Sequence, residues 1–398
     1  MSTRVNPKLL QQCNEYGGVN VDACFNCGNC TAVCSMTTEE ESFPRTLIRY
    51  AQVGMEDKLL GSKELWLCYN CGECTETCPR QADPARFMMA ARCYAITHYD
   101  ISGISKLMCR SSVFAILFAI ALLVIFGGFM YTRTAEISTE SLKLFEFIPY
   151  EFIHTGGLIA IVFLFVVGLI GIIRMITTVG RASNLSLKSF VSGEKMNWWG
   201  ALWDAVAVQS LGQKRYRDDC VAEENVHGWY LSKWFVHAAT MWGFLGLLAA
   251  TILNWVFDVA GLKPTGTHVP IWYPVRLLGT IAGLLFIYGV TVLIIRRWRK
   301  TDAAHSNSRT SDWLFLVILW LAGVTGFIIE IALYLPNPPV WGYWMFLFHV
   351  AVSMELLLLL PFSKFAHSIY RIIALYIYAL KPIPREEKEL ADPAGAAD

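Results

Sequence analysis

Six long apolar segments constrain the fold of this 398-residue chain more than any other feature. Each is close to the ~20 residues that a helix needs to cross the hydrocarbon core of a bilayer. Inside a bilayer the backbone must satisfy its own hydrogen bonds, so each segment is expected to be helical. The composition agrees, with 55% hydrophobic residues and a mean hydropathy of +0.43. The predicted spans are residues 112–131, 152–176, 232–257, 273–295, 312–335 and 343–363.

The basic residues of the connecting loops predict the orientation of these spans. Lys and Arg gather in the loops 177–231 and 296–311, whereas the opposite loops carry only Arg133, Lys143 and Lys263. Basic loops tend to stay on the cytoplasmic side of a membrane. We therefore predict a multi-pass protein of the cytoplasmic membrane, with both termini and the region before the first span in the cytoplasm.

Two cysteine runs precede the first span, and both have the spacing C-x2-C-x2-C-x3-C. In proteins with two clusters, three thiolates of such a run bind one [4Fe–4S] cluster and the fourth binds the other cluster. Two ligand sets follow, which we name cluster 1 and cluster 2. The ligands of cluster 1 are predicted to be Cys24, Cys27, Cys30 and Cys78, and those of cluster 2 Cys68, Cys71, Cys74 and Cys34.

Two structural zinc sites are the alternative for these cysteines. Zinc would also take four sulfurs at each site, but it leaves the third cysteine of each run unexplained. Pro79 follows the second run, whereas Ser35 follows the first, and this proline shapes a turn and binds no iron. The remaining cysteines are expected to be free thiols of a reducing compartment.

The region around the cysteine runs is predicted to be helical. Apolar residues recur at spacings of three and four in 43–54, 56–67 and 85–98, with no alternating strand pattern. We predict a cytoplasmic helical ferredoxin domain over residues 1–110. Its arginines are expected to give it a basic side, which could offset the charge of the clusters, face an acidic partner or be solvated: Arg45, Arg49, Arg80, Arg86 and Arg92. No basic patch interleaved with aromatic residues occurs there, so no nucleic-acid partner is expected.

Four histidines lie in or beside the predicted spans, where an ionisable residue usually has a function. The orientation places His154 and His349 near the outer face, and His237 and His367 near the inner face. His367 follows His349 by eighteen residues, about 27 Å of helix. We predict two b haems, one with the axial pair His237 and His367 and one with the pair His154 and His349.

Each histidine taken alone could instead be a hydrogen-bonded packing residue. The paired depths favour haem, and small residues nearby leave room for a flat macrocycle: Gly156, Gly157, Gly243 and Gly246. The predicted fold class is therefore all-α. A helical two-cluster ferredoxin domain (1–110) is followed by a six-helix transmembrane dihaem cytochrome b bundle (111–380) and a disordered tail (381–398).

A quinone site is predicted at the outer ends of the spans, where polar residues could bind the quinone head and handle protons. Glu330 interrupts the apolar run 326–334, and a carboxylate there is costly without a role or a partner. Glu355, six residues after His349, is the second candidate for proton handling. Asp258, His268 and Arg276 are further polar residues at the outer ends. An ordinary polar rim is the alternative for each of them.

The segment from His349 to His367 resembles the last helix of the gamma subunit of respiratory nitrate reductase, which is a dihaem cytochrome b. In that family both histidines of this helix are axial ligands, and their partners lie ten residues apart on one earlier helix. His237 matches the first partner, but residue 247 is Leu. We therefore assign His154 to the outer haem on depth alone, with His268 as the rival.

The first hundred residues resemble the C subunit of heterodisulfide reductase, through Cys24–Cys34, Pro44-Arg45, Trp66-Leu-Cys68 and Cys78-Pro-Arg80. The two parts fused in this order resemble the C subunit of the quinone-interacting membrane-bound oxidoreductases of sulfate reducers. The resemblance implies menaquinone as substrate and soluble partners that contain flavin and iron–sulfur clusters. These partners would be the A and B subunits of that complex, similar to the A subunit of heterodisulfide reductase, with adenylylsulfate reductase beyond them.

These observations predict the electron-transfer subunit of a quinone-linked oxidoreductase complex. Electrons would pass between menaquinone, two b haems, two [4Fe–4S] clusters and flavoprotein subunits, in dissimilatory sulfate reduction. One alternative is the same type of subunit serving heterodisulfide or dissimilatory sulfite reduction. The other is a haem-free membrane anchor that carries a ferredoxin domain.

Overall fold

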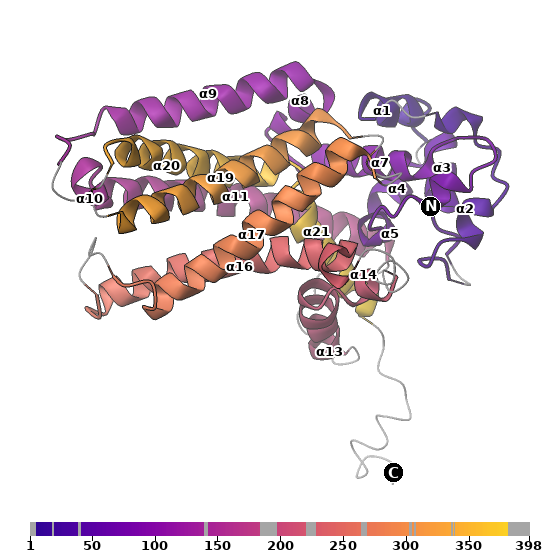
Figure 1. Cartoon of the computed structure of the whole chain (residues 1–398). Helices are drawn as coiled ribbons and strands as arrows, with labels where there is room; N and C mark the ends of the chain where they lie inside the picture. The colour runs from indigo at the N-terminus through magenta and orange to yellow at the C-terminus, as the bar shows by residue number, and fades with distance from the viewer. Residues whose placement is uncertain are drawn as a thin grey trace, which may run out of the picture. The chain divides into compact units, whose positions relative to one another are not determined.

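A computed structural model describes the helices of most of the chain (Figure 1). It describes residues 5–17, 20–38, 41–138, 142–183, 197–219, 228–263, 269–301, 305, 308–335, 337 and 339–380. Every regular element in these ranges is a helix, which confirms the predicted all-helical class. The tail predicted to be disordered, 381–398, lies outside the described residues.

The chain divides into two compact units that differ from the predicted domains. The head unit consists of residues 1–101, 169–216 and 366–398, and the membrane unit of residues 102–168 and 217–365. The sequence predicts contiguous domains that meet at residue 110. One reason for the difference is the helix α11, Tyr150–Ala182. Its 33 residues extend for about 50 Å, which exceeds the ~30 Å hydrocarbon core. Its C-terminal part therefore belongs to the head unit.

The helices of the head unit are short. The segment predicted over 43–54 forms α3, and the segment over 56–67 forms α4 and α5, which are separated by the extended residue Ser62. The bounds are α1 Leu9–Glu15, η1 Val21–Ala23, α2 Asn29–Ala32, α3 Arg45–Gln52, α4 Glu56–Gly61, α5 Glu64–Leu67, α6 Glu73–Glu76, α7 Pro84–Tyr99, α13 Trp198–Trp203, the π-helix η2 Asp204–Leu211, and α21 Ala366–Ala379. Helix α14, Lys214–Asp219, crosses the division between the units.

Helix α7 is the longest helix that lies wholly within the head unit, and its start is well defined. Asp83 caps it by accepting a hydrogen bond from Arg86 N, and Pro84 occupies the first turn, where its missing N–H has no cost. Phe87 and Met88 are fully buried on this helix. Truncating a buried Phe to Ala costs about 3–5 kcal/mol, so α7 is central to the stability of the head unit.

Helix α21 packs against the helices that flank the second cysteine run. The Tyr370 ring lies 5.1 Å from the Trp66 ring and 5.4 Å from the Tyr99 ring, both edge to face. The Tyr370 hydroxyl also approaches Gly171 of α11, where an added Cβ would lie 2.5 Å from it. Aromatic clusters of this kind bury a large apolar area, and they hold α21 close to residues 66–68.

The six predicted spans are confirmed as helices long and apolar enough to cross a membrane. They are α9 Ser112–Tyr131, α11, α16 Lys233–Val259, α17 Pro274–Arg299, α19 Thr310–Tyr334 and Trp341–Phe362, which comprises α20 Trp341–Leu359 and η4 Leu360–Phe362. The membrane unit also contains α8 Ile104–Arg110, α10 Leu144–Phe147 and η3 Trp229–Leu231.

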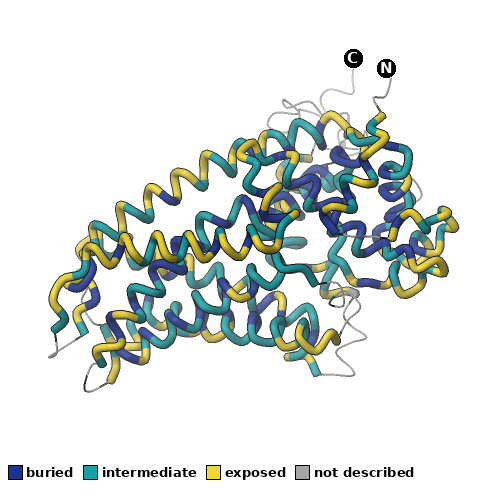
Figure 2. Tube along the Cα trace, turned by 90° about the horizontal axis from the view of Figure 1, so that it is seen from above, coloured by how far each residue is buried: buried dark blue, intermediate teal, exposed yellow. Residues whose placement is uncertain are grey.

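Helix α20 is the most buried of these helices and packs beside α19 and α9 (Figure 1). Half of the most apolar stretch of its span is buried, compared with 11% for α11. Exposed positions recur along the membrane helices (Figure 2), and many of them are large apolar side chains such as Phe165 and Ile159. An apolar surface of this extent requires a cover such as lipid.

Helices α16 and α17 form a closely packed pair, and small residues make the close approach possible (Figure 1). A Cβ at Gly243 would lie 2.5 Å from the backbone nitrogen of Phe286, and one at Gly246 would lie 2.7 Å from Ala282 Cβ. The sequence-based prediction places these two glycines beside a haem. Both glycines lie at this helix–helix contact, where small residues are common in membrane proteins, and their place beside a haem stays a prediction.

The segment from His349 to His367 is not one continuous helix, contrary to the sequence-based expectation of about 27 Å of helix. Helix α20 ends at Leu359, η4 follows, Ser363 is extended, and α21 begins at Ala366. Pro361 accounts for the break, because proline has no N–H for an α-helical hydrogen bond and its ring clashes with the preceding turn. The two histidines therefore lie on different helices and in different units.

Candidate functional site

The two cysteine runs adopt nearly the same backbone. Asn26 and Asn70 have φ of 62° and 60°, and Gly28 and Gly72 have φ of 94° and 98°. These left-handed conformations favour Gly and Asn, which explains both residue types at equivalent positions. Each glycine directly precedes a short helix, α2 or α6, that contains the third cysteine of the run. Local sequence thus builds two matching loops.

The first group of thiols surrounds Cys30. Burial raises the pKa of the Cys30 thiol, and the nearby thiols of Cys24, then Cys27 and Cys78, raise it further. Cys78 belongs to the second run in the sequence, yet it joins the first run in space. The structure therefore brings together the four cysteines predicted for cluster 1.

The second group surrounds Cys74 and Cys34. Burial raises the pKa of Cys74, followed by the nearby thiols of Cys68, Cys71 and Cys34. Burial also raises the pKa of Cys34 to about 11, and Cys68 and Cys71 add to this. These are the four cysteines predicted for cluster 2. Cys30 of the first group also raises the pKa of both Cys34 and Cys74, so the two groups adjoin.

The donor set, two groups of four thiols, fits cubane clusters. Within the described ranges, no three His, Cys, Asp or Glu side chains converge as ligands of one metal ion. A cubane binds one thiolate at each of its iron atoms, so its ligands surround a volume and need not meet at a point. Bound iron requires the thiolate form, and its positive charge would offset the raised pKa values of these thiols.

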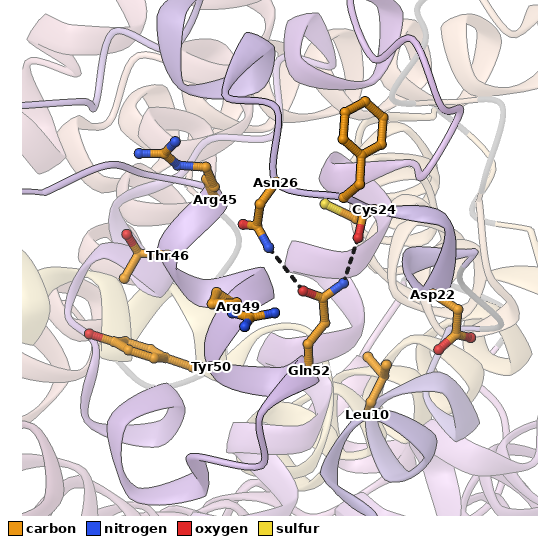
Figure 3. Close-up of a pocket in the computed structure, with 10 residues that line it drawn as sticks. Leu10, Asp22, Cys24, Asn26, Arg45, Thr46, Arg49, Tyr50 and Gln52 are labelled. Carbon is orange, nitrogen blue, oxygen red and sulfur yellow. Dashed lines mark hydrogen bonds between the residues drawn. The ribbon is translucent and has the colours of Figure 1, made fainter.

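A pocket of about 730 Å³ lies beside the first run (Figure 3). Gln52 donates from Nε2 to the backbone oxygen of Cys24 at 2.9 Å, and its Oε1 accepts from Asn26 Nδ2 at 3.1 Å. Arg45, Arg49 and Asp22 are among the other residues that line this pocket. The carbonyl of Cys24, the first cysteine of the first run, therefore accepts from a neutral amide, and side chains of both charges line the pocket beside it.

The carbonyl of the first cysteine of run 2 has a different environment. Arg92 donates from Nη2 to Cys68 O and from Nε to Leu65 O, the latter at 2.7 Å. Arg371 of α21 donates from Nη1 to Cys68 O at 3.2 Å and to Trp66 O at 3.4 Å. Two guanidinium groups thus converge on one backbone oxygen of a predicted cluster ligand.

The predicted basic side of the head is therefore only partly on the surface. Arg92 is buried, and Arg86 donates to Gly17 O at 2.8 Å, whereas Arg49 and Arg80 are exposed. Sequence reasoning did not identify Arg371 or Gln52 as neighbours of the cysteines. Their contacts span 303 and 28 residues of sequence, and no local pattern signals them.

His349 is held firmly in the membrane unit. Its Nδ1 lies 2.9 Å from Thr325 Oγ1, and its ring lies against Gly326, where an added Cβ would be 3.0 Å from Cε1. An imidazole fixed through one nitrogen is oriented to present the other to a metal. His349 therefore fits the role of an axial ligand.

His154 has a different environment. Its ring is exposed and stacks against Tyr150, with 5.7 Å between centroids, and against Trp255, with 6.4 Å. The rings of His154 and His349 make no contact with each other in the residues described. His268, the rival partner of His349, lies outside these residues. The pairing of His154 with His349 stays a prediction.

His237 and His367 belong to different units. His237 is exposed on α16, and His367 is half-buried near the start of α21. The side chains of His237 and His367 each interact with other residues. Their pairing about an inner haem also stays a prediction.

Two of the predicted quinone-site residues lie on facing helices. Glu330 of α19 accepts a hydrogen bond from Thr280 of α17 at 2.5 Å, and Arg276 of α17 lies 6.0 Å from the ring centre of Tyr334. Other candidates are placed elsewhere. Glu355 is buried on α20, and Asp258 forms an ion pair with Lys263 at 3.5 Å. An ion pair gives Asp258 a structural explanation.

These features define a class of protein: a membrane protein of six apolar helices with an iron–sulfur electron-transfer domain. Residues 20–82 match the 4Fe-4S dicluster domain family. Residues 106–387, more than half of the chain, match the family described as Citrate utilization protein B. The chain therefore belongs to the Citrate utilization protein B family. The membrane part matches this family and not the gamma subunit of nitrate reductase that its last segment resembles.

The curated relatives support the same division. Citrate utilization protein B of Escherichia coli is 30% identical over 166 residues, which is 40% of each chain. The C subunit of the H(2):CoB-CoM heterodisulfide,ferredoxin reductase of Methanothermobacter thermautotrophicus is 31% identical over 88 residues, 22% of this chain and 48% of the relative. The iron-sulfur C subunit of the CoB--CoM heterodisulfide reductase of Methanopyrus kandleri is 32% identical over 96 residues, 22% of this chain and 50% of the relative.

These matches confirm the resemblance of the head to the C subunit of heterodisulfide reductase. The chain spans half or less of the length of each of these relatives. No solved structure matches the chain. The similarity shows a 4Fe-4S dicluster domain in the head, like that of the iron–sulfur C subunits of these reductases.

Proposed function

We propose that this chain is a membrane electron-transfer subunit of a quinone-linked oxidoreductase in the cytoplasmic membrane. Electrons pass between menaquinone in the bilayer and flavoprotein subunits in the cytoplasm. The observation that carries this proposal is that one chain contains both two groups of four thiols and six apolar helices. One of these helices contains His349, whose ring is held by a contact with Thr325.

The eight cysteines of the two runs would hold the two [4Fe–4S] clusters. When bound, each cluster supplies a one-electron redox centre. The chain's own contribution is to position the two thiol groups side by side, and the effect of Cys30 on the pKa of Cys74 supports this. Backbone N–H groups near the sulfurs, such as Asn70 N at 3.4 Å from Cys68 Sγ, would stabilise the negative charge of bound thiolates.

Two b haems would be held by the pairs His237 with His367 and His154 with His349. Bound haem supplies a one-electron centre within the bilayer. Thr325 supports this assignment for His349, because its contact with Nδ1 leaves Nε2 as the nitrogen for iron. Gly326 keeps the space that the ring requires.

The outer ends of α17 and α19 would bind the quinone head. Glu330 and Arg276 offer an acceptor and a donor on facing helices, and Thr280 holds the Glu330 carboxyl in place. Oxidation of a quinol releases two protons, and Glu330 is positioned to accept one. Glu355, buried without a hydrogen-bonding partner among the described residues, would serve as a second proton-handling group.

The partners proposed are flavin- and iron–sulfur-containing subunits similar to the A subunit of heterodisulfide reductase, with adenylylsulfate reductase as the enzyme served. The resemblance of the fused architecture to the C subunit of the quinone-interacting membrane-bound oxidoreductases favours this choice. Two other assignments remain candidates. The likeness of the head to the C subunit of heterodisulfide reductase favours heterodisulfide reduction, and the family match favours a role in citrate utilisation.

Purification of the native complex in mild detergent tests this proposal. The reduced visible spectrum should show b haem, and the co-purified soluble subunits should contain flavin. A preparation with iron–sulfur clusters and no haem would identify the chain as a ferredoxin-bearing anchor. Co-purification with a citrate-metabolising enzyme, and without a flavoprotein like the A subunit of heterodisulfide reductase, would favour the citrate role.

A further inference from the structure

The two cysteine runs act as an internal comparison, because their backbones match and their surroundings differ. Cys24 and Cys68 occupy the same first position in each run. A neutral amide from Gln52 meets the Cys24 carbonyl, whereas the guanidinium groups of Arg92 and Arg371 both meet the Cys68 carbonyl. The equivalent carbonyls therefore differ in their surroundings by two positive charges.

These two arginines have no carboxylate partner in the part of the chain that the structure describes. Arg92 is only 9% exposed, and Arg371 is half-buried. A buried guanidinium without a counter-charge is costly. Cys68 is near both arginines, and Cys93 is also near Arg92, so the thiolates around Cys68 can supply that charge. A [4Fe–4S] cluster with four thiolates has a net charge of about −2 when oxidised and about −3 when reduced.

Cations also lie near the first run, where Arg45 Nη1 would be 3.4 Å from a Cβ at Gly28, but they contact the cluster ligands differently. Arg80 donates from Nε to Ala23 O at 3.4 Å, but its side chain is exposed, so solvent screens it. Arg45 and Arg49 line the pocket beside Cys24 together with Asp22, whose charge is opposite. Neither of these arginines donates to the carbonyl of a cluster ligand among the described contacts.

We propose that Arg92 and Arg371 raise the reduction potential of cluster 2 above that of cluster 1, so that an electron in the head resides mainly on cluster 2. A fixed cation stabilises the reduced cluster more than the oxidised one, because the reduced form has the larger negative charge. The ligand sets come from the proposed function, on which this inference rests. Arg371 also follows His367 by one turn of α21. The same helix therefore joins the proposed haem ligand to the cation on cluster 2.

Redox titration of the purified full chain, followed by EPR under anaerobic conditions, tests the proposal. Arg371→Gln removes the charge and retains an amide donor, and Arg371→Lys retains the charge. In Arg371→Gln the equilibrium constant for reduction of cluster 2 should fall at least tenfold, which is about 59 mV for a one-electron couple. In Arg371→Lys it should change by less than about threefold. Cluster 1 should keep its potential in both variants.

Arg86→Gln is the matched control, because Arg86 lies on the same helix as Arg92 and donates to Gly17 O. It should leave both potentials unchanged. The spectra of Cys27→Ser and Cys71→Ser assign each signal to its cluster. The wild-type chain provides an independent measurement, since cluster 2 must be reduced at the higher potential even if Arg371→Gln fails to fold.

Several results would overturn the proposal. These are a wild-type cluster 1 with the higher potential, an unchanged cluster 2 in Arg371→Gln, equal shifts of both clusters, or equal shifts in the Gln and Lys variants. A wild-type chain without iron would instead refute cluster binding itself. A chain with both clusters and unshifted potentials would leave the proposed function intact and refute only the electrostatic role.

Discussion

The exchange of ligands between the two cysteine runs gives the sharpest prediction. Cys78 belongs to the second run, but its thiol is one of those that raise the pKa of Cys30 in the first. Cys78→Ser should therefore remove cluster 1 and leave cluster 2, although the change lies in the second run. Cys34→Ser is the reciprocal variant and should remove cluster 2, because Cys34 adjoins Cys68 and Cys71.

The magnitude follows from the cluster composition. Each [4Fe–4S] cluster contains four irons, so the wild-type chain should hold about eight and each Ser variant about four. The hydroxyl oxygen of Ser is a poorer ligand for cluster iron than a thiolate. The side chains of Cys34 and Cys78 are only partly buried, so replacing sulfur by oxygen changes little of the buried core.

Iron and sulfide analysis, together with EPR of the reduced protein, measures this outcome. Cys27→Ser and Cys71→Ser serve as references. Both cysteines are exposed, and each belongs to the three cysteines of its run that bind the same cluster. The spectrum of Cys78→Ser should match that of Cys27→Ser. A match with Cys71→Ser would refute the crossed assignment, and stoichiometric zinc without iron in the anaerobic wild-type protein would refute the clusters themselves.

Three further predictions concern the membrane unit. His237→Ala and His367→Ala should each remove one of two haems, measured by the pyridine haemochrome assay. Both variants should also stop the reduction of the clusters by quinol. Full haem content in both variants would contradict this pairing. His154→Ala and His349→Ala should give the same spectral loss. Gly326→Ala should weaken the binding of that haem, because its Cβ would lie 3.0 Å from the His349 ring, whereas Gly128→Ala, with open space around it, should not. Loss of haem in His268→Ala but not in His154→Ala would transfer the assignment to His268. Glu330→Gln should slow haem reduction by a menaquinol analogue at least tenfold, while its dithionite-reduced spectrum stays normal. Normal kinetics of quinol oxidation in Glu330→Gln, together with slow kinetics in Arg174→Ala, would move the quinone site to the cytoplasmic side.

Much of the fold could be predicted from the sequence, because the constraints on it are local. The length and apolarity of the six spans follow from the thickness of a bilayer, and all six segments are helices in the structure. The cysteine spacing, with Asn26, Gly28 and their equivalents, defines two matching loops. These signals lie within a few residues of one another.

The errors and omissions concern interactions between distant segments. Pro361 lies in the break between α20 and α21, so the distance from His349 to His367 is not that of one continuous helix. The packing of Gly243 and Gly246 against α17 cannot be read from either helix alone. Arg371 reaches Cys68 across 303 residues, and Thr325 reaches His349 from a neighbouring helix. Such contacts depend on the tertiary fold.

Reduction of the clusters by quinol tests the central claim most directly. The purified full chain, oxidised and anaerobic, would be mixed with a menaquinol analogue, and haem absorbance and cluster EPR would be followed in freeze-quenched samples. The proposal predicts that haem is reduced first and a cluster signal appears afterwards, and that the His367→Ala variant loses the cluster signal. Clusters that stay oxidised in the wild-type chain while dithionite reduces them, or clusters that quinol reduces equally well in His367→Ala, would contradict it.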